Sequence, residues 1–131
     1  MRLDRFTIKA QEALQEGQKK AESMDQQEVL PEHLLDALLV QEGGFAGQVL
    51  QRAGADARLI ITQLEASLKK LPKVYGGAGA AYLSQRLKSV LDGSQKEARD
   101  MKDDFTSVEH MLLAITGERG GEASRILGGQ G

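Results

Sequence analysis

The stretch Leu30–Gly44, LPEHLLDALLVQEGG, occurs a second time in altered form as Ser107–Gly121, SVEHMLLAITGERGG. Both copies place a Glu-His pair at the start of an apolar run and end in a pair of glycines. In both copies the apolar residues recur every three or four positions, the spacing that lines one face of a helix. The stretch therefore predicts a helix that the chain uses twice.

The repetition extends over a whole structural unit. Shifting the sequence by 77 positions aligns Thr7–Gly54 with Ser84–Gly131 without a gap, and 14 of the 48 aligned pairs are identical. About three identities are expected by chance at average composition. Matches that keep one spacing across several elements indicate a supersecondary unit used twice. We therefore expect an all-α fold built from two pseudo-repeats of a four-helix unit.

The chain is expected to form a single domain over residues 1–131. Repeat one is predicted to span 7–71 and repeat two 84–131, and the counterpart of the fourth helix would begin at Gly131, so the last helix of repeat two is expected to be missing from the chain. The glycine-rich residues 72–83 between the repeats are compatible with a mobile linker and also with an ordered strap over a groove.

Local signals place the starts of the helices. Ser, Thr and Asp are favoured as N-caps because their side chains accept a hydrogen bond from an amide of the first turn, and Pro is tolerated at the first helical position. A short third helix is expected to contain Val49, Leu50 and Ala53 and to end at Gly54. The other predicted helix starts are at Thr7, Pro31, Asp56, Ser84 and Ser107.

The composition excludes several classes of function. The 131 residues have a formal net charge of −2 with cationic and acidic residues interspersed, so no concentrated patch for nucleic-acid phosphates is expected. The chain contains no Cys, which excludes disulfides, thiol nucleophiles and thiolate metal sites. The opening MRLDRF lacks the apolar stretch of a secretory signal, and no apolar run reaches the ~20 residues of a membrane span. We expect a cytoplasmic protein that binds neither nucleic acid nor membrane.

No catalytic or cofactor motif is found in the sequence. The glycine clusters lack the Lys-Ser/Thr of a phosphate-binding loop. The Glu32-His33 and Glu109-His110 pairs are interpreted either as metal or acid–base pairs, or as cap residues, with Glu favouring the positive end of the helix dipole and His bonding local backbone. The second interpretation is favoured, because the chain has no H-E-x-x-H spacing and no third ligand nearby. We expect no enzymatic activity, no metal site and no cofactor in this chain.

Four segments together resemble one known family. They are MRLDRFTIKAQEAL at 1–14, LPEHLLDALLVQEGG at 30–44, LKKLPKV at 68–74 and FTSVEHMLLAI at 105–115. They are similar to the N-terminal repeat domain of Clp-family AAA+ chaperones, of the ClpB type. The resemblance implies a parent protein that forms a hexameric ring through absent modules, binds ATP and Mg there, threads aggregated polypeptide and cooperates with a DnaK-type chaperone system. The fragment itself is expected to be monomeric.

The same resemblance implies where substrates bind. The family associates a polar cluster and an apolar groove with substrate handling, and the pair Leu91 and Val108 would lie in that groove beside a strap formed by Tyr75–Tyr82. The implied substrate-binding residues are Thr7, Leu91, Asp103, Val108 and Glu109.

The expected function is binding of exposed apolar segments of unfolded or aggregated proteins, which the domain presents to the AAA+ ring. Two alternatives remain from the sequence. The module binds a folded adaptor protein, as its ClpA and ClpC relatives do, or it is a helical scaffold that binds neither kind of partner.

Overall fold

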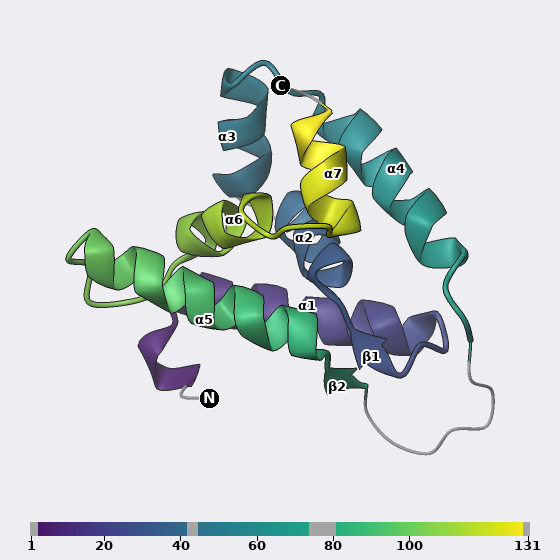
Figure 1. Ribbon diagram of the computed structural model, residues 1–131, viewed down its shortest axis with the longest axis horizontal. Helices are drawn as coiled ribbons and strands as arrows, with labels where there is room; N and C mark the ends of the chain where they lie inside the picture. The colour runs from purple at the N-terminus through teal and green to yellow at the C-terminus, as the bar shows by residue number, and fades with distance from the viewer. Residues whose placement is uncertain (1–2, 42–44, 74–80, 130–131) are drawn as a thin grey trace.

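The helices of repeat one follow directly from its sequence pattern. The computed structural model describes residues 3–41, 45–73 and 81–129, and a 3-10 turn, η1 (Leu3–Arg5), precedes the first helix. The helices are α1 (Ile8–Ser23), α2 (Pro31–Val40), α3 (Phe45–Arg52) and α4 (Ala57–Lys69) (Figure 1). In the described part of the chain, the predicted four-helix unit is therefore present.

Repeat two reproduces the first three helices of repeat one. It contains α5 (Gln85–Asp100), α6 (Val108–Thr116) and α7 (Glu122–Gly128). Both bounds of α5 equal those of α1 shifted by 77 residues. The all-α class and the duplicated unit are thus confirmed. No helix within the described ranges is long and apolar enough to cross a membrane.

Three of the predicted caps are made as expected. The Thr7 hydroxyl accepts from the amide of Ala10 at 3.2 Å, and the Ser84 hydroxyl accepts from the amide of Leu87 at 3.0 Å. The Asp56 carboxylate caps α4 in the same way. Ser107 occupies the predicted N-cap position of α6, where its Oγ lies 3.0 Å from Nδ1 of His110 in the first turn. The predicted start of α6 at Ser107 is therefore confirmed.

The first helix of each repeat ends in the same turn. Asp25 and Lys102, equivalent residues of the two repeats, have left-handed backbone angles with φ of 57° and 62°. The amide of the next residue, Gln26 or Asp103, then donates to a carbonyl of the last helical turn at 2.9 Å. This turn places Gln26 and Asp103 at equivalent points, each ahead of the second helix of its repeat.

Short backbone pairings join the two repeats reciprocally. The strand β1 (Glu28–Val29), just before α2, pairs in parallel with β2 (Tyr82–Leu83), just before α5. Likewise Phe6, before α1, forms a parallel bridge with Thr106, before α6. The start of each first helix is therefore tied to the start of the other repeat's second helix. The sequence did not predict these pairings, because two residues are too few to show the alternation of a strand.

The helix α2 lies at the centre of the molecule (Figure 1) and packs against α1, α3, α4, α6 and α7. All residues from 31 to 38 are buried, so α2 is covered on every side rather than along one stripe. The helix α4 buries Ile60, Leu64 and Leu68 completely, and packs against both α2 and α7. The fourth helix of repeat one thus also covers part of repeat two.

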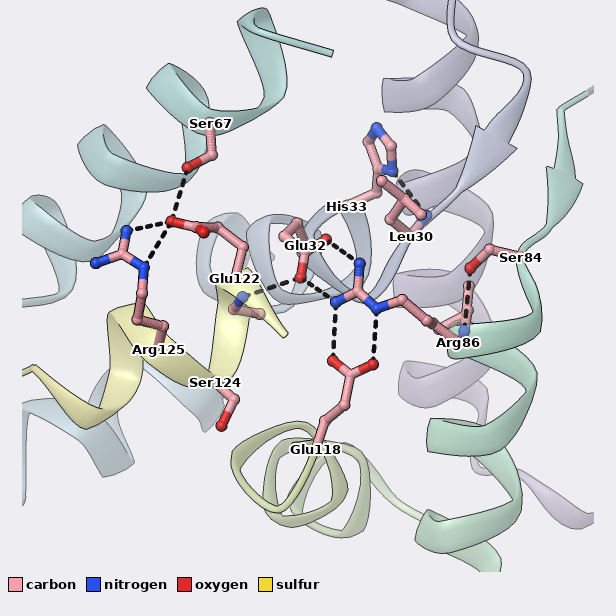
Figure 2. Close-up of polar contacts among 12 residues, drawn as sticks. Leu30, Glu32, His33, Ser67, Ser84, Arg86, Glu118, Glu122, Ser124 and Arg125 are labelled. Carbon is pink, nitrogen blue, oxygen red and sulfur yellow. Dashed lines mark hydrogen bonds and ion pairs between the residues drawn. The ribbon is translucent and has the colours of Figure 1, made fainter. Parts of the chain in front are cut away.

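The buried first turn of α2 requires a counter-charge, which repeat two supplies. The Glu32 carboxylate is nearly inaccessible and accepts from Arg86 Nη1 and Nη2 at 3.1 and 2.8 Å. The same guanidinium binds Glu118 through Nε and Nη2 at 2.8 and 2.9 Å, and the amide of Ala123 donates to Glu32 at 2.9 Å (Figure 2). Hydrogen bonds to Glu118, and also to Glu32, raise the pKa of Arg86 further. This cluster connects α2 with α5, α7 and the turn after α6.

Replacing Arg86 with Met should destabilise the domain, because the Glu32 carboxylate would remain buried without its counter-charge. Breaking a buried ion pair from one side is strongly destabilising, and since Arg86 is itself partly exposed we expect a loss of roughly 2–3 kcal/mol. Urea denaturation measures this loss. The control Lys96→Met removes an exposed pair with Asp100 and should leave the free energy of unfolding nearly unchanged. Equal effects of the two variants would contradict the role assigned to Arg86.

Candidate functional site

Backbone pairing brings the predicted polar residues together around the start of α6. The amide of Thr7 donates to the carbonyl of Thr106 at 2.9 Å, and the amide of Thr106 donates to the carbonyl of Arg5 at 2.8 Å. Thr7 therefore lies beside the residues that lead into α6, and Glu109 occupies the first turn of that helix. These residues come from opposite ends of the sequence, and the pairing between repeats is what joins them.

A buried histidine connects the start of α6 to Asp103. The amide of Ser107 donates to His110 Nδ1 at 2.8 Å, and His110 Nε2 lies 2.9 Å from Asp103 Oδ2. Because Nδ1 accepts from a backbone amide, the ring proton must be on Nε2, which donates to the carboxylate. The His110 side chain is buried, whereas that of Asp103 is 52% exposed. The histidine thus holds a surface carboxylate in a defined orientation.

The equivalent chain of hydrogen bonds in repeat one lies entirely inside the protein. The amide of Leu30 donates to His33 Nδ1 at 2.8 Å, His33 Nε2 lies 2.6 Å from Gln26 Oε1, and Gln26 Nε2 donates to the carbonyl of Leu68 at 2.7 Å. Leu68 belongs to α4, so the buried Gln26 links the start of α2 to that helix. The hydrogen-bond chain through the equivalent histidine therefore ends at the internal carbonyl of Leu68 in repeat one and at the exposed carboxylate of Asp103 in repeat two.

At the start of both second helices, a histidine Nδ1 accepts the hydrogen bond of the N-cap residue's amide. Leu30 has no side-chain oxygen, and Ser107 Oγ lies 3.0 Å from His110 Nδ1. The prediction that the paired histidines bond local backbone is confirmed. Their second bonds, to Gln26 and Asp103, could have been found in the sequence only by asking which polar residue stands at the same distance before each histidine.

The paired glutamates have different surroundings. Glu32 is buried and bound by Arg86 and an amide of α7, whereas Glu109 is exposed and has no ion pair or hydrogen bond with the described part of the chain. The sequence grouped both as first-turn glutamates and missed the ion pair of Glu32. The only available signal was that Arg86 aligns with another cation, Lys9, at the shift of 77.

The predicted apolar residues do not form an exposed groove. Leu91 is completely buried and belongs to the core. It is therefore not exposed for contact with substrate, contrary to the prediction. Val108 is 8% exposed and also packs in the core. Of the predicted strap Tyr75–Tyr82, residues 75–80 lie outside the described residues, and Tyr82 is exposed in β2.

An apolar pocket occurs instead on the side of repeat one. Leu14, the residue equivalent to Leu91, lines a pocket of about 290 Å³ together with Leu3, Leu83 and glutamines of α1. The sequence did not predict this pocket, because its walls come from η1, α1 and β2. As for metals, the described residues contain no group of three or more His, Asp or Glu side chains that could hold an ion.

Residues 5–130 match the family described as the Clp repeat (R) N-terminal domain. The chain belongs to this family. Two ClpB chaperones illustrate the similarity: one from Nitratidesulfovibrio vulgaris is 41% identical over 131 residues, and one from Rhizobium meliloti is 36% identical over 127 residues. These matches cover 98% and 97% of this chain but 15% of each relative, so the chain spans about one-seventh of the length of the ClpB proteins that it matches.

Solved Clp N-terminal domains share the fold. The Hsp104 N-terminal domain from Candida albicans superimposes with a TM-score of 0.84 at 20% identity, covering 95% of this chain and 81% of that one. The N-terminal domain of the ClpV1 ATPase from E. coli gives a TM-score of 0.77 at 24% identity, covering 87% and 69%. The resemblance to a ClpB-type Clp N-terminal domain is confirmed.

The buried, hydrogen-bonded His33 should make the Clp domain less stable in acid. Burial is the largest cause that lowers the pKa of His33 from its ordinary 6.5 to about 4. The unfolded chain therefore binds more protons between these two pH values, so this contribution is complete above about pH 6.5 and is lost as the pH falls toward 4. The contribution amounts to roughly 3 kcal/mol.

His33→Asn tests this dependence by urea denaturation at a series of pH values. The difference in unfolding free energy between the natural chain and the variant should be largest near neutral pH and should shrink in acid. Titrating carboxylates common to both proteins cancel in that difference. A difference that stays constant with pH would contradict a neutral, buried His33.

Proposed function

We propose that this chain is the substrate-handling N-terminal domain of a ClpB-type, ATP-dependent disaggregase of the cytoplasm. It binds exposed apolar segments of unfolded or aggregated proteins and presents them to the AAA+ ring. The chain contributes binding and no catalysis, and ATP is hydrolysed in other modules, which assemble the hexamer. The match to ClpB proteins over nearly the whole chain supports the proposal. We also propose that a DnaK-type chaperone system cooperates with the parent protein through regions outside this domain.

The observation that carries the proposal is the difference between equivalent positions of the two repeats. Around α2 the polar groups have internal partners: Arg86 binds the carboxylate of Glu32, and the carbonyl of Leu68 accepts from the side chain of Gln26. Around α6 the equivalent carboxylates, Glu109 and Asp103, face solvent. A carboxylate whose orientation is fixed by a buried histidine has already lost part of its freedom, so binding to it requires less ordering.

Weak binding is expected from this surface. The polar edge is exposed, the pocket beside Leu14 is open to solvent, and neither offers the deep, desolvated anchor of a tight interface. A domain that transfers clients to a ring must also release them, so a low affinity agrees with the proposed function.

A second candidate is recognition of a folded adaptor protein. The exposed carboxylates Asp103, Asp104 and Glu109 near the start of α6 favour it, because charged side chains typically form the rim of interfaces between folded proteins. An adaptor would require a folded surface, whereas client capture requires an unfolded one, and this difference separates the two functions.

An NMR titration of the ¹⁵N-labelled chain tests both candidates. The partners are a permanently unfolded, reduced and alkylated test protein and the same protein in its folded state. Shift changes near Thr7, Asp103 and Glu109 with the unfolded form alone would support client capture. Changes with folded proteins alone would favour the adaptor function, and no changes at millimolar concentration would leave a scaffold.

Substitutions at Asp103 separate charge from orientation. Asp103→Gln copies Gln26 of repeat one, so it keeps an acceptor for His110 but removes the charge. We expect it, like Glu109→Gln, to weaken binding of the unfolded protein by roughly tenfold, as loss of a hydrogen bond to a charged group does. Glu16→Gln, an exposed carboxylate in the third turn of α1, is the control and should bind normally.

A further inference from the structure

On the outer edge of β2, two backbone groups form no hydrogen bond with the described part of the chain. The amides of Tyr82 and Ser84 point toward β1 and donate to the carbonyls of Gln27 and Val29 at 2.9 and 3.1 Å. Because successive residues of a strand direct their backbone groups to opposite sides, the N–H and C=O of Leu83 point away from β1. Within the described ranges, neither group of Leu83 forms a hydrogen bond.

Side chains of α1 close the same edge one step earlier. Ala81 faces the same side as Leu83, and its N–H donates to Glu22 Oε2 while its C=O accepts from Gln18 Nε2, both at 2.9 Å. One to two turns back along α1 from Gln18, the helix presents Gln15, Leu14 and Gln11, and these line the pocket that Leu83 also lines. The edge is therefore closed at Ala81 and open at Leu83.

Repeat one shows how the equivalent position is closed internally. Leu83 corresponds to Phe6 at the shift of 77. The amide of Phe6 donates to the carbonyl of Leu3 at 3.0 Å, and its carbonyl accepts from Gln11 Nε2 at 2.9 Å. Among the described residues, Leu83 forms neither bond, and Lys88 stands in the place of Gln11. An extended chain with a free N–H and C=O would supply both.

The pocket beside Leu83 adds an apolar requirement. It provides about 290 Å³, with walls formed by Leu3, Leu14 and Leu83, which is room for an apolar side chain. Leu3 is 45% exposed, so an incoming apolar group would cover surface that is now wetted. A backbone edge next to an apolar pocket is the combination used by domains that bind peptides through strand addition.

We propose that an extended segment of a client polypeptide adds to β2 at Leu83. One client residue exchanges two hydrogen bonds with the N–H and C=O of Leu83, and the apolar side chain of an adjacent client residue enters the pocket beside Leu14. The client chemistry is an unpaired backbone with one apolar side chain, which unfolded segments of many sequences offer and folded surfaces do not. The inference deepens the proposed client capture and rests on it.

A short peptide added to the ¹⁵N-labelled full chain tests the strand addition. The probe is a capped peptide of about seven residues with one central leucine flanked by threonines. We expect the Leu83 amide to shift downfield and to exchange more slowly with solvent, while the amide of Ala81, already bound to Glu22, changes little. N-methylation scanned along the peptide should weaken binding roughly fivefold at the residue that pairs with Leu83. An unchanged Leu83 amide, or no sensitive position, would overturn the proposal.

A matched pair of variants tests the pocket. Leu3→Asp places a charge in the pocket wall, and Leu59→Asp changes an equally exposed leucine on α4, since their exposures are 45% and 43%. Leu3→Asp should weaken the peptide by roughly tenfold or more, and Leu59→Asp should leave it unchanged. Equal effects of the two variants would overturn the assignment of the pocket.

The outcomes also separate this inference from the proposed function. If unfolded protein binds near Thr7, Asp103 and Glu109 but leaves the Leu83 amide unchanged and is insensitive to Leu3→Asp, strand addition is wrong and client capture stands. If unfolded protein does not bind at millimolar concentration, both are wrong. A Leu83 shift that depends only on the concentration of the chain itself would assign the edge to a second copy and overturn the proposal.

Discussion

The structure depends on the burial of residues 31–38 of α2, including the polar residues of its first turn. A helix covered on every side has no water to satisfy Glu32, His33 or its own terminal amides, so protein groups must do so. Arg86 comes from repeat two, and Gln26 leads to α4 through the carbonyl of Leu68. The central helix thus holds both repeats and the fourth helix in one arrangement.

The reciprocal backbone pairings have a related consequence. Because the start of α1 is tied to the start of α6, and the start of α5 to that of α2, neither repeat can place its second helix without the other. The polar residues Thr7 and Glu109, far apart in the sequence, are neighbours for this reason. We therefore expect the two halves to unfold together as one domain.

Duplication followed by divergence explains why one side of the molecule is closed and the other open. Equivalent positions carry Gln26 and Asp103, or Phe6 and Leu83, and in each pair the repeat-one residue is bound internally. The partner that completes each bond in repeat one has no counterpart in the described part of repeat two. Asp103 and Leu83, the positions that lack such an internal partner, are the ones to which we assign binding.

The sequence by itself determined the helices, their caps and the duplication, because helical periodicity and N-cap chemistry act over a few residues and survive comparison of the chain with itself. It also predicted Thr7, Asp103 and Glu109 as a group through resemblance, but it placed Leu91 on the surface when that residue is in the core. Only the tertiary structure decided which of two equivalent groups is buried, paired or free. That choice depends on what the other repeat brings into contact, as Arg86 does for Glu32 and α1 does for β2, and such long-range contacts leave no local pattern in the chain.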